Sequence, residues 1–166
     1  ISRHGVPAGE IAKQVIDEIS PLYPAESQSL NRELCQILIA LNAPNAVEKT
    51  VALLKAATTQ EEQIFFAVSL RNVKAGWTPE LRRAYLSWWN QPYSTEHPAQ
   101  VNQWFEEAGI RFNNGASFAN FMANAHEEVK FTMTPEEIIA MADLLAEYDK
   151  VHPAKQAYVP GPPREL

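Results

Sequence analysis

The sequence predicts an all-α protein of seven or eight helices. Three observations lead to this prediction. Apolar residues recur at spacings of three and four over most of the chain, which is the period of an amphipathic helix. Capping residues and prolines stand where such helices would begin, and no useful stretch alternates as a β-strand would. The 166 residues, 46% of them hydrophobic, are enough for one domain with a sizeable core.

Three helices are expected in the first third of the chain, over 9–20, about 27–42 and about 44–57. Each has its apolar residues on one face. Pro21 ends the first helix, and Ser27 or Ser29 can cap the second. Pro44 stands where the first turn of the third helix tolerates a proline.

The next two helices have the clearest boundary signals. Thr59 and Glu62 have the spacing of a capping box, and the helix that they open is expected to end at Gly76 in a left-handed conformation. Thr78 is followed by Pro79, which predicts a fifth helix with proline at its first position. That helix should run to about residue 89.

The remaining helices are expected over about 99–108, from a cap at Ser117, and from a second capping box at Thr134 through Tyr148. Beyond them the chain ends in Pro-rich sequence that cannot be helical. We therefore expect a helical domain over 1–150 and a Pro-rich linker or tail over 151–166. Both ends of the sequence suggest a piece cut from a longer protein.

Two helix pairs, over about 27–57 and about 59–90, follow each other with similar lengths and short turns. Such a succession is typical of a HEAT-like α-solenoid, in which each pair packs on the next. A plain helical bundle is the alternative.

Charge and cysteine content exclude several classes. The net charge is −6, and residues 84–166 carry all of it, with 5 basic and 11 acidic residues. Without a basic patch, a nucleic-acid partner is not expected. No apolar run reaches the length of a transmembrane helix, so membrane insertion is not expected either. The single cysteine, Cys35, allows no internal disulfide and is expected to be a buried structural thiol.

Residues 60–86 are distinctive, and Trp88-Trp89-Asn90 follows them directly. The string includes Gln63, Ala67, Leu70-Arg71, Gly76-Trp77-Thr78-Pro79 and Leu81-Arg82, with Gly115 and Ser117-Phe118 later in the chain. Over roughly residues 30–150 this resembles the HEAT-like helical region of the PVC-type heme-binding proteins. Those are large exported bacterial proteins that join a β-propeller, this helical segment and a cytochrome c domain.

The resemblance implies a non-catalytic spacer or docking domain of a larger periplasmic or exported redox protein. Its partners would be the neighbouring propeller and cytochrome c domains. The chain itself contains no Cys-x-x-Cys-His, so we expect no covalent heme, no cofactor and no enzyme activity. The alternative is a free-standing helical module that binds a peptide or a carbohydrate through a Trp-rich face.

No catalytic or metal-binding set of residues emerges from the sequence. His126 precedes two glutamates, but such a run more often forms a solvated helix face than a metal site. The residues singled out as possible binding residues, or as clasps between helices, are Gln63, Arg71, Trp77, Trp88, Trp89 and Trp104. Trp88 and Trp89 cannot face the same side of a helix, so one should be buried and the other partly exposed.

The acidic C-terminal half is the predicted docking surface for a neutral or basic partner, with Glu106, Glu107, Glu127 and Glu128 as its carboxylates. The alternative is that this acidity only keeps the domain soluble.

Overall fold

In the computed structural model, which describes residues 7–92 and 114–152, every regular element is helical, as the sequence predicts. The described part of the chain contains eight α-helices and one short 3-10 helix, η1. In chain order they are α1 (Gly9–Ile19), η1 (Ser20–Leu22), α2 (Gln28–Ala40), α3 (Ala46–Ala56), α4 (Gln60–Leu70), α5 (Pro79–Trp89), α7 (Asn114–Lys130), α8 (Pro135–Ala140) and α9 (Ala142–Val151).

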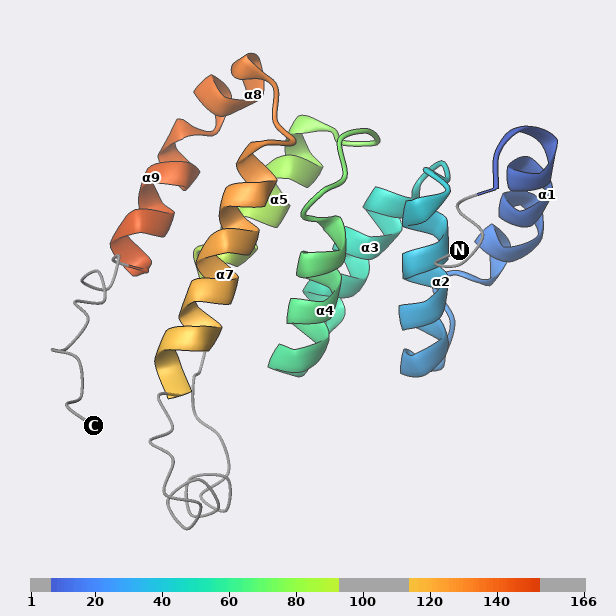
Figure 1. The fold of residues 1–166 in the computed structure, drawn as a ribbon, viewed down its shortest axis with the longest axis horizontal. Coiled ribbons are helices and arrows are strands. Elements are labelled where there is room, and N and C mark those ends of the chain that lie inside the picture. The colour runs from blue at the N-terminus through green and yellow to red at the C-terminus, as the bar shows by residue number, and fades with distance from the viewer. Residues whose placement is uncertain (1–6, 93–113, 153–166) are drawn as a thin grey trace, which may run out of the picture.

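The helices stand side by side in a row, from α1 at one end to α8 and α9 at the other (Figure 1). Helix α3 packs against α2 and α4, while α2 also packs against α4 and α3 against α5. A helix in this part of the row therefore contacts both the next helix and the one after it. Helix α5 packs against α9, and α1 contacts mainly η1. The core runs along the row from Tyr23 to Tyr148.

Hydroxyl side chains cap four of the helices, and they belong to Ser27, Thr59, Thr78 and Thr134. The capping box of Thr134 and Glu137 is confirmed, with both reciprocal bonds formed. At Thr59 only half of the predicted box forms. The Thr59 hydroxyl accepts from the Glu62 amide, but the Glu62 carboxylate accepts from Gln28 Nε2 of α2 instead of reaching back. A contact between helices replaces a local one there.

Two predicted boundaries in the first half are wrong. Helix α4 ends at Leu70, six residues before Gly76, because the Arg71 amide bonds the Val68 carbonyl in a tighter turn. Gly76 does have the predicted left-handed conformation, with φ of 84°, but it lies in the loop between α4 and α5. Pro44 precedes α3, whose N-cap is Asn45.

Two more predictions fail in the second half. Ser117 does not cap a helix, since α7 already begins at Asn114. The final helix is not continuous: Met141, with φ of −114° and ψ of 14°, separates α8 from α9, and its side chain is buried in the core. The predicted helix over 99–108 lies outside the described residues, and so does the predicted tail from residue 153 onward.

The core near α2 and α3 contains a small cluster of polar side chains. Thr50 donates to the Ala46 carbonyl at 2.7 Å, and its hydroxyl also lies 2.8 Å from the hydroxyl of Tyr23. Cys35 is fully buried, and its Sγ lies 3.8 Å from the Thr50 hydroxyl. Burial raises the pKa of the Cys35 thiol, so the thiol stays protonated and unreactive, as a structural cysteine should.

Gly76 supplies a stability test of the loop between α4 and α5. A Cβ at this position would lie 3.1 Å from Val47 Cγ2, and the positive φ strains any other residue. Gly76→Ala should therefore lower the free energy of unfolding by about 1–2 kcal/mol, measured by denaturant unfolding. Asn42, with φ of 52°, is the matched control: Asn42→Gly should not destabilise. Equal stability of Gly76→Ala and the parent would contradict the strain argument.

Candidate functional site

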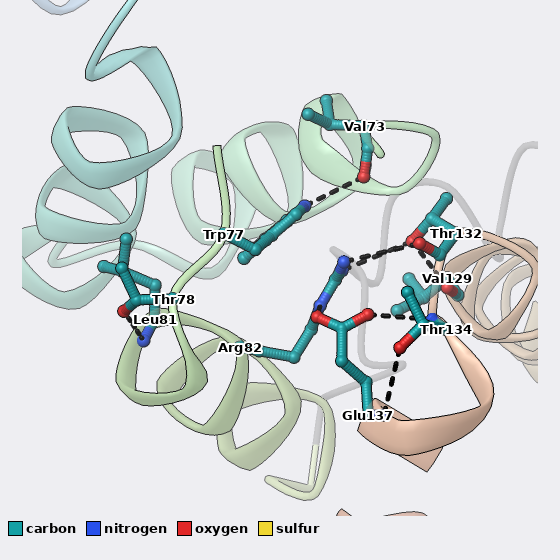
Figure 2. A network of polar contacts seen from close by, with 9 residues as sticks. All are labelled: Val73, Trp77, Thr78, Leu81, Arg82, Val129, Thr132, Thr134 and Glu137. Carbon is teal, nitrogen blue, oxygen red and sulfur yellow. Dashed lines mark hydrogen bonds and ion pairs between the residues drawn. The ribbon is translucent and has the colours of Figure 1, made fainter. Parts of the chain in front are cut away.

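Arg82 is a buried cation where α5 meets the turn between α7 and α8 (Figure 2). The Thr78 cap begins α5, which places Arg82 in its first turn with a side chain that is 0% exposed. Its Nε donates to Glu137 at 3.2 Å, and its Nη1 donates to the Thr132 hydroxyl at 3.3 Å. Its guanidinium also lies over the indole of Trp77, 4.0 Å from the ring centroid.

Each partner of Arg82 is itself held in place. The Thr132 hydroxyl donates to the Val129 carbonyl at 2.7 Å, which leaves its lone pairs free to accept from Arg82. The second carboxylate oxygen of Glu137 accepts from the Thr134 amide at 2.8 Å. One carboxylate thus completes the cap of α8 and neutralises the cation on α5. Trp77 is fixed in the same way, since its Nε1 donates to the Val73 carbonyl at 2.8 Å.

The electrostatics of this junction are those of a structural ion pair. Burial lowers the pKa of Arg82, while the negative charge of Glu137 acts in the opposite direction. A guanidinium keeps its proton in proteins, so the network holds a positive charge whose main compensation is Glu137. With its donors directed at Glu137 and Thr132 and its face on Trp77, this cation is engaged by the chain itself.

Two further ion pairs join the end of α4 to α7 and join α5 to α9. Arg71 donates from Nε to Glu128 of α7 at 2.6 Å and from Nη1 to the Val68 carbonyl at the end of α4. Asn72 donates to the same carboxylate at 3.2 Å. On α5, Arg83 pairs with Asp143 of α9 at 2.9 Å. Arg71 thus bonds both a carbonyl at the end of α4 and a carboxylate of α7, while the cation over Trp77 is Arg82.

Gln63 joins α4 to α5. Its Nε2 donates to the Ala57 carbonyl at 3.0 Å, and its Oε1 accepts from the indole Nε1 of Trp88 at 3.2 Å. A cavity of about 20 Å³ lies beside Gln63, Trp88 and Met122. That volume holds about one water molecule, so this pocket does not accommodate a sugar ring.

The tryptophans divide as their spacing predicts. Trp89 is 1% exposed and Trp88 is half-buried, which confirms that one faces the core and the other lies at its edge. Trp77 is half-buried, packed between Arg82 and Tyr85. One face of the Trp77 ring covers the guanidinium of Arg82. Trp104 lies outside the described residues.

The prediction that His126 lies on a solvated helix face is wrong. It is fully buried on the inner face of α7, where its ring stacks on Tyr148 of α9 with centroids 3.5 Å apart, and the ring of Trp89 lies 5.7 Å away. Neither ring nitrogen has a hydrogen-bond partner among the described residues. Burial, with a smaller contribution from Lys130, lowers the pKa of His126 to about 4. The neutral imidazole therefore serves as a core residue.

Arg82 is the residue that sequence reasoning undervalued. In the sequence it is one position of the distinctive string, and no role of its own is predicted for it. The signal was nevertheless present, since the buried face of α5 consists of residues at spacings of three and four, Arg82, Tyr85, Leu86 and Trp89. An arginine in a core position requires a partner from another helix, but its identity depends on which helix packs there.

Comparison with protein-family models, with curated proteins and with solved structures found no match to this chain. Among the described residues, no three histidine, cysteine or acidic side chains come together as metal ligands would. None of the described helices is both long enough and apolar enough to cross a membrane.

The charge of Glu137 should be more important for stability than its hydrogen bonds. Glu137→Gln keeps an oxygen for the Thr134 amide but leaves the buried Arg82 uncompensated. We expect the free energy of unfolding to fall by about 2–4 kcal/mol, measured by denaturant unfolding. The exposed neighbour is the matched control, and Glu136→Gln should change stability by less than about 0.5 kcal/mol. Equal effects of the two substitutions would refute the role of the ion pair.

His126 should make the protein sensitive to mild acid. Its pKa is about 4 in the folded chain and near 6.5 in the unfolded chain, so the unfolded chain takes up the proton first as pH falls. The free energy of unfolding should fall between about pH 6.5 and pH 4, by on the order of 3 kcal/mol, and this contribution should level off below pH 4.

The measurement is urea unfolding from pH 7 to pH 4, compared between the parent and two variants, His126→Phe and His126→Leu. Because both variants lack the imidazole, the difference in pH slope isolates His126 from the carboxylates. A parent slope that matches both variants over this range would contradict the prediction.

Proposed function

We propose that this chain is a non-catalytic, HEAT-like helical module that spaces and docks neighbouring domains of a larger exported heme-containing redox protein. The observation that carries the proposal is that the distinctive polar residues bond other helices of the chain. Gln63, Arg71 and Arg82 direct their donors at other parts of the same chain and so join successive helices. Residues that hold a row of helices together are what a spacer requires.

The packing order supports a solenoid. Contacts of α2 with α3 and α4, and of α3 with α4 and α5, are those of helix pairs stacked in two layers. Arg71 at the end of α4, and Arg82 and Arg83 on α5, then tie these pairs to the helices that follow. Their ion pairs are Arg71–Glu128, Arg82–Glu137 and Arg83–Asp143. Such a row keeps its two ends at a defined separation.

The heme-containing parent and its exported location rest on the sequence resemblance. The matching string includes Trp77 and Arg82, which contact each other, and Arg71, which pairs separately with Glu128 of α7. These positions of the string thus take part in contacts between helices, which supports a shared architecture. In such a parent, the partners would be a β-propeller and a cytochrome c domain.

The intact polypeptide provides the test. An antibody raised against this chain should detect, in the source organism, a polypeptide much larger than 18.6 kDa in the exported fraction. The same band should stain for heme after denaturation, because a cytochrome c domain holds its heme covalently. The isolated 166-residue chain is the control and should not stain.

An 18.6 kDa band without heme would overturn the proposal and favour the free-standing binding module. A larger band without heme would retain a multi-domain parent but remove its redox role.

A further inference from the structure

A groove lies between α1 and α2. These two helices form the end of the row opposite α9 (Figure 1). The volume of the groove is about 600 Å³, and one wall is formed by Glu33, Gln36, Ile37 and Ala40 of α2 and by Leu41 directly after it. Pro7 and Val15 line the other side. No residue of α1 is buried, so the apolar side of this helix is only partly covered by the chain.

The groove has the pattern of a seat for a helix. On the α2 side the lining residues follow one another at i, i+3, i+4, i+7 and i+8, so they lie along one face. Glu33 and Gln36 are its polar members, and Ile37, Ala40 and Leu41 its apolar ones. On α1, Ile11 lies one turn before Val15 on the same face and is 63% exposed. Two helices that present apolar residues at this spacing to a shared groove match the apolar face of a third, amphipathic helix.

Charge indicates which kind of helix fits. Residues 7–41 contain five acidic and two basic side chains, a net charge of −3. The acidic residues are all exposed, and none forms an ion pair with another described residue; they are Glu10, Asp17, Glu18, Glu26 and Glu33.

In the second half, by contrast, five carboxylates are used in ion pairs: Glu127, Glu128, Glu137, Asp143 and Glu147. Among the acidic residues outside these ion pairs, Glu33 lines the groove, and Glu10, Asp17 and Glu18 lie on α1, the helix on its other side. The groove therefore lies between two helices that both carry acidic side chains. A second copy of the chain would oppose two acidic faces, which disfavours self-association there.

We propose that the groove between α1 and α2 is a docking site for a basic amphipathic helix of a partner protein or domain. Apolar side chains of that helix would enter between Val15 and Ile37, and its lysines or arginines would face Glu33 and the acidic side chains nearby. This site lies away from the Arg82 junction, and the inference does not depend on the proposed redox parent.

The test uses the 166-residue chain and a synthetic helical peptide of about 18 residues. The peptide carries leucines at i, i+3, i+4 and i+7 and lysines on both flanks, and a second peptide has glutamates in place of the lysines. By titration calorimetry, the basic peptide should bind, the acidic peptide should bind at least tenfold more weakly, and affinity should fall as salt rises to about 0.5 M.

Two matched pairs of variants locate the site. Ile37→Ser and Glu33→Lys should each weaken binding about tenfold, while the exposed controls at the other end, Ile139→Ser and Glu136→Lys, should leave it unchanged. Because Ile37 is half-buried, thermal unfolding of that variant confirms that it is folded, and Glu33→Lys tests the site independently of it.

Absence of binding, equal binding of both peptides, or equal losses in the control variants would overturn the proposal. A dimer in sedimentation experiments that Ile37→Ser abolishes would overturn it as well, because the occupant would then be a second copy.

Discussion

The buried guanidinium of Arg82 is the constraint on which the second half of the row depends. A positive charge removed from water needs a carboxylate and further acceptors, and all of them come from the turn after α7 and from α8. The position of α8 is thereby coupled to that of α5. Trp77 covers one face of the guanidinium and donates to the Val73 carbonyl, so the loop after α4 is coupled to Arg82 as well.

This arrangement gives a physical reason for the uneven charge of the chain. The first half is neutral and the second half is acidic, yet three of the described carboxylates in the second half pair with arginines of the first. Much of the acidity that marked the C-terminal half as a docking surface serves attachment within the molecule. Glu128 in particular is occupied by Arg71 and Asn72, whereas Glu106 and Glu107 lie outside the described residues. The docking role of that half stays a prediction.

The proposed functions place different demands on the two ends of the row. A spacer requires that successive helices keep their relative positions, and the junction around Arg82 supplies contacts for this. A docking site requires surface that the chain leaves uncovered, and the α1–α2 groove, which Glu33 lines, has that property. The two roles are compatible because they use separate residues.

Local signals in the sequence determined the helices. Thr134 and Glu137 form the capping box that their spacing predicts, and Gly76 adopts a left-handed backbone readily because it has no Cβ. Contacts between distant residues decided the rest. His126 is buried because α9 places Tyr148 against it. The Glu62 carboxylate accepts from Gln28 of α2 and does not complete the capping box at Thr59. Arg82 has its partner because α8 folds back onto α5, 55 residues later in the chain. Periodicity and capping describe neighbours along a helix, but the pairing of helices depends on packing, which only the tertiary structure specifies.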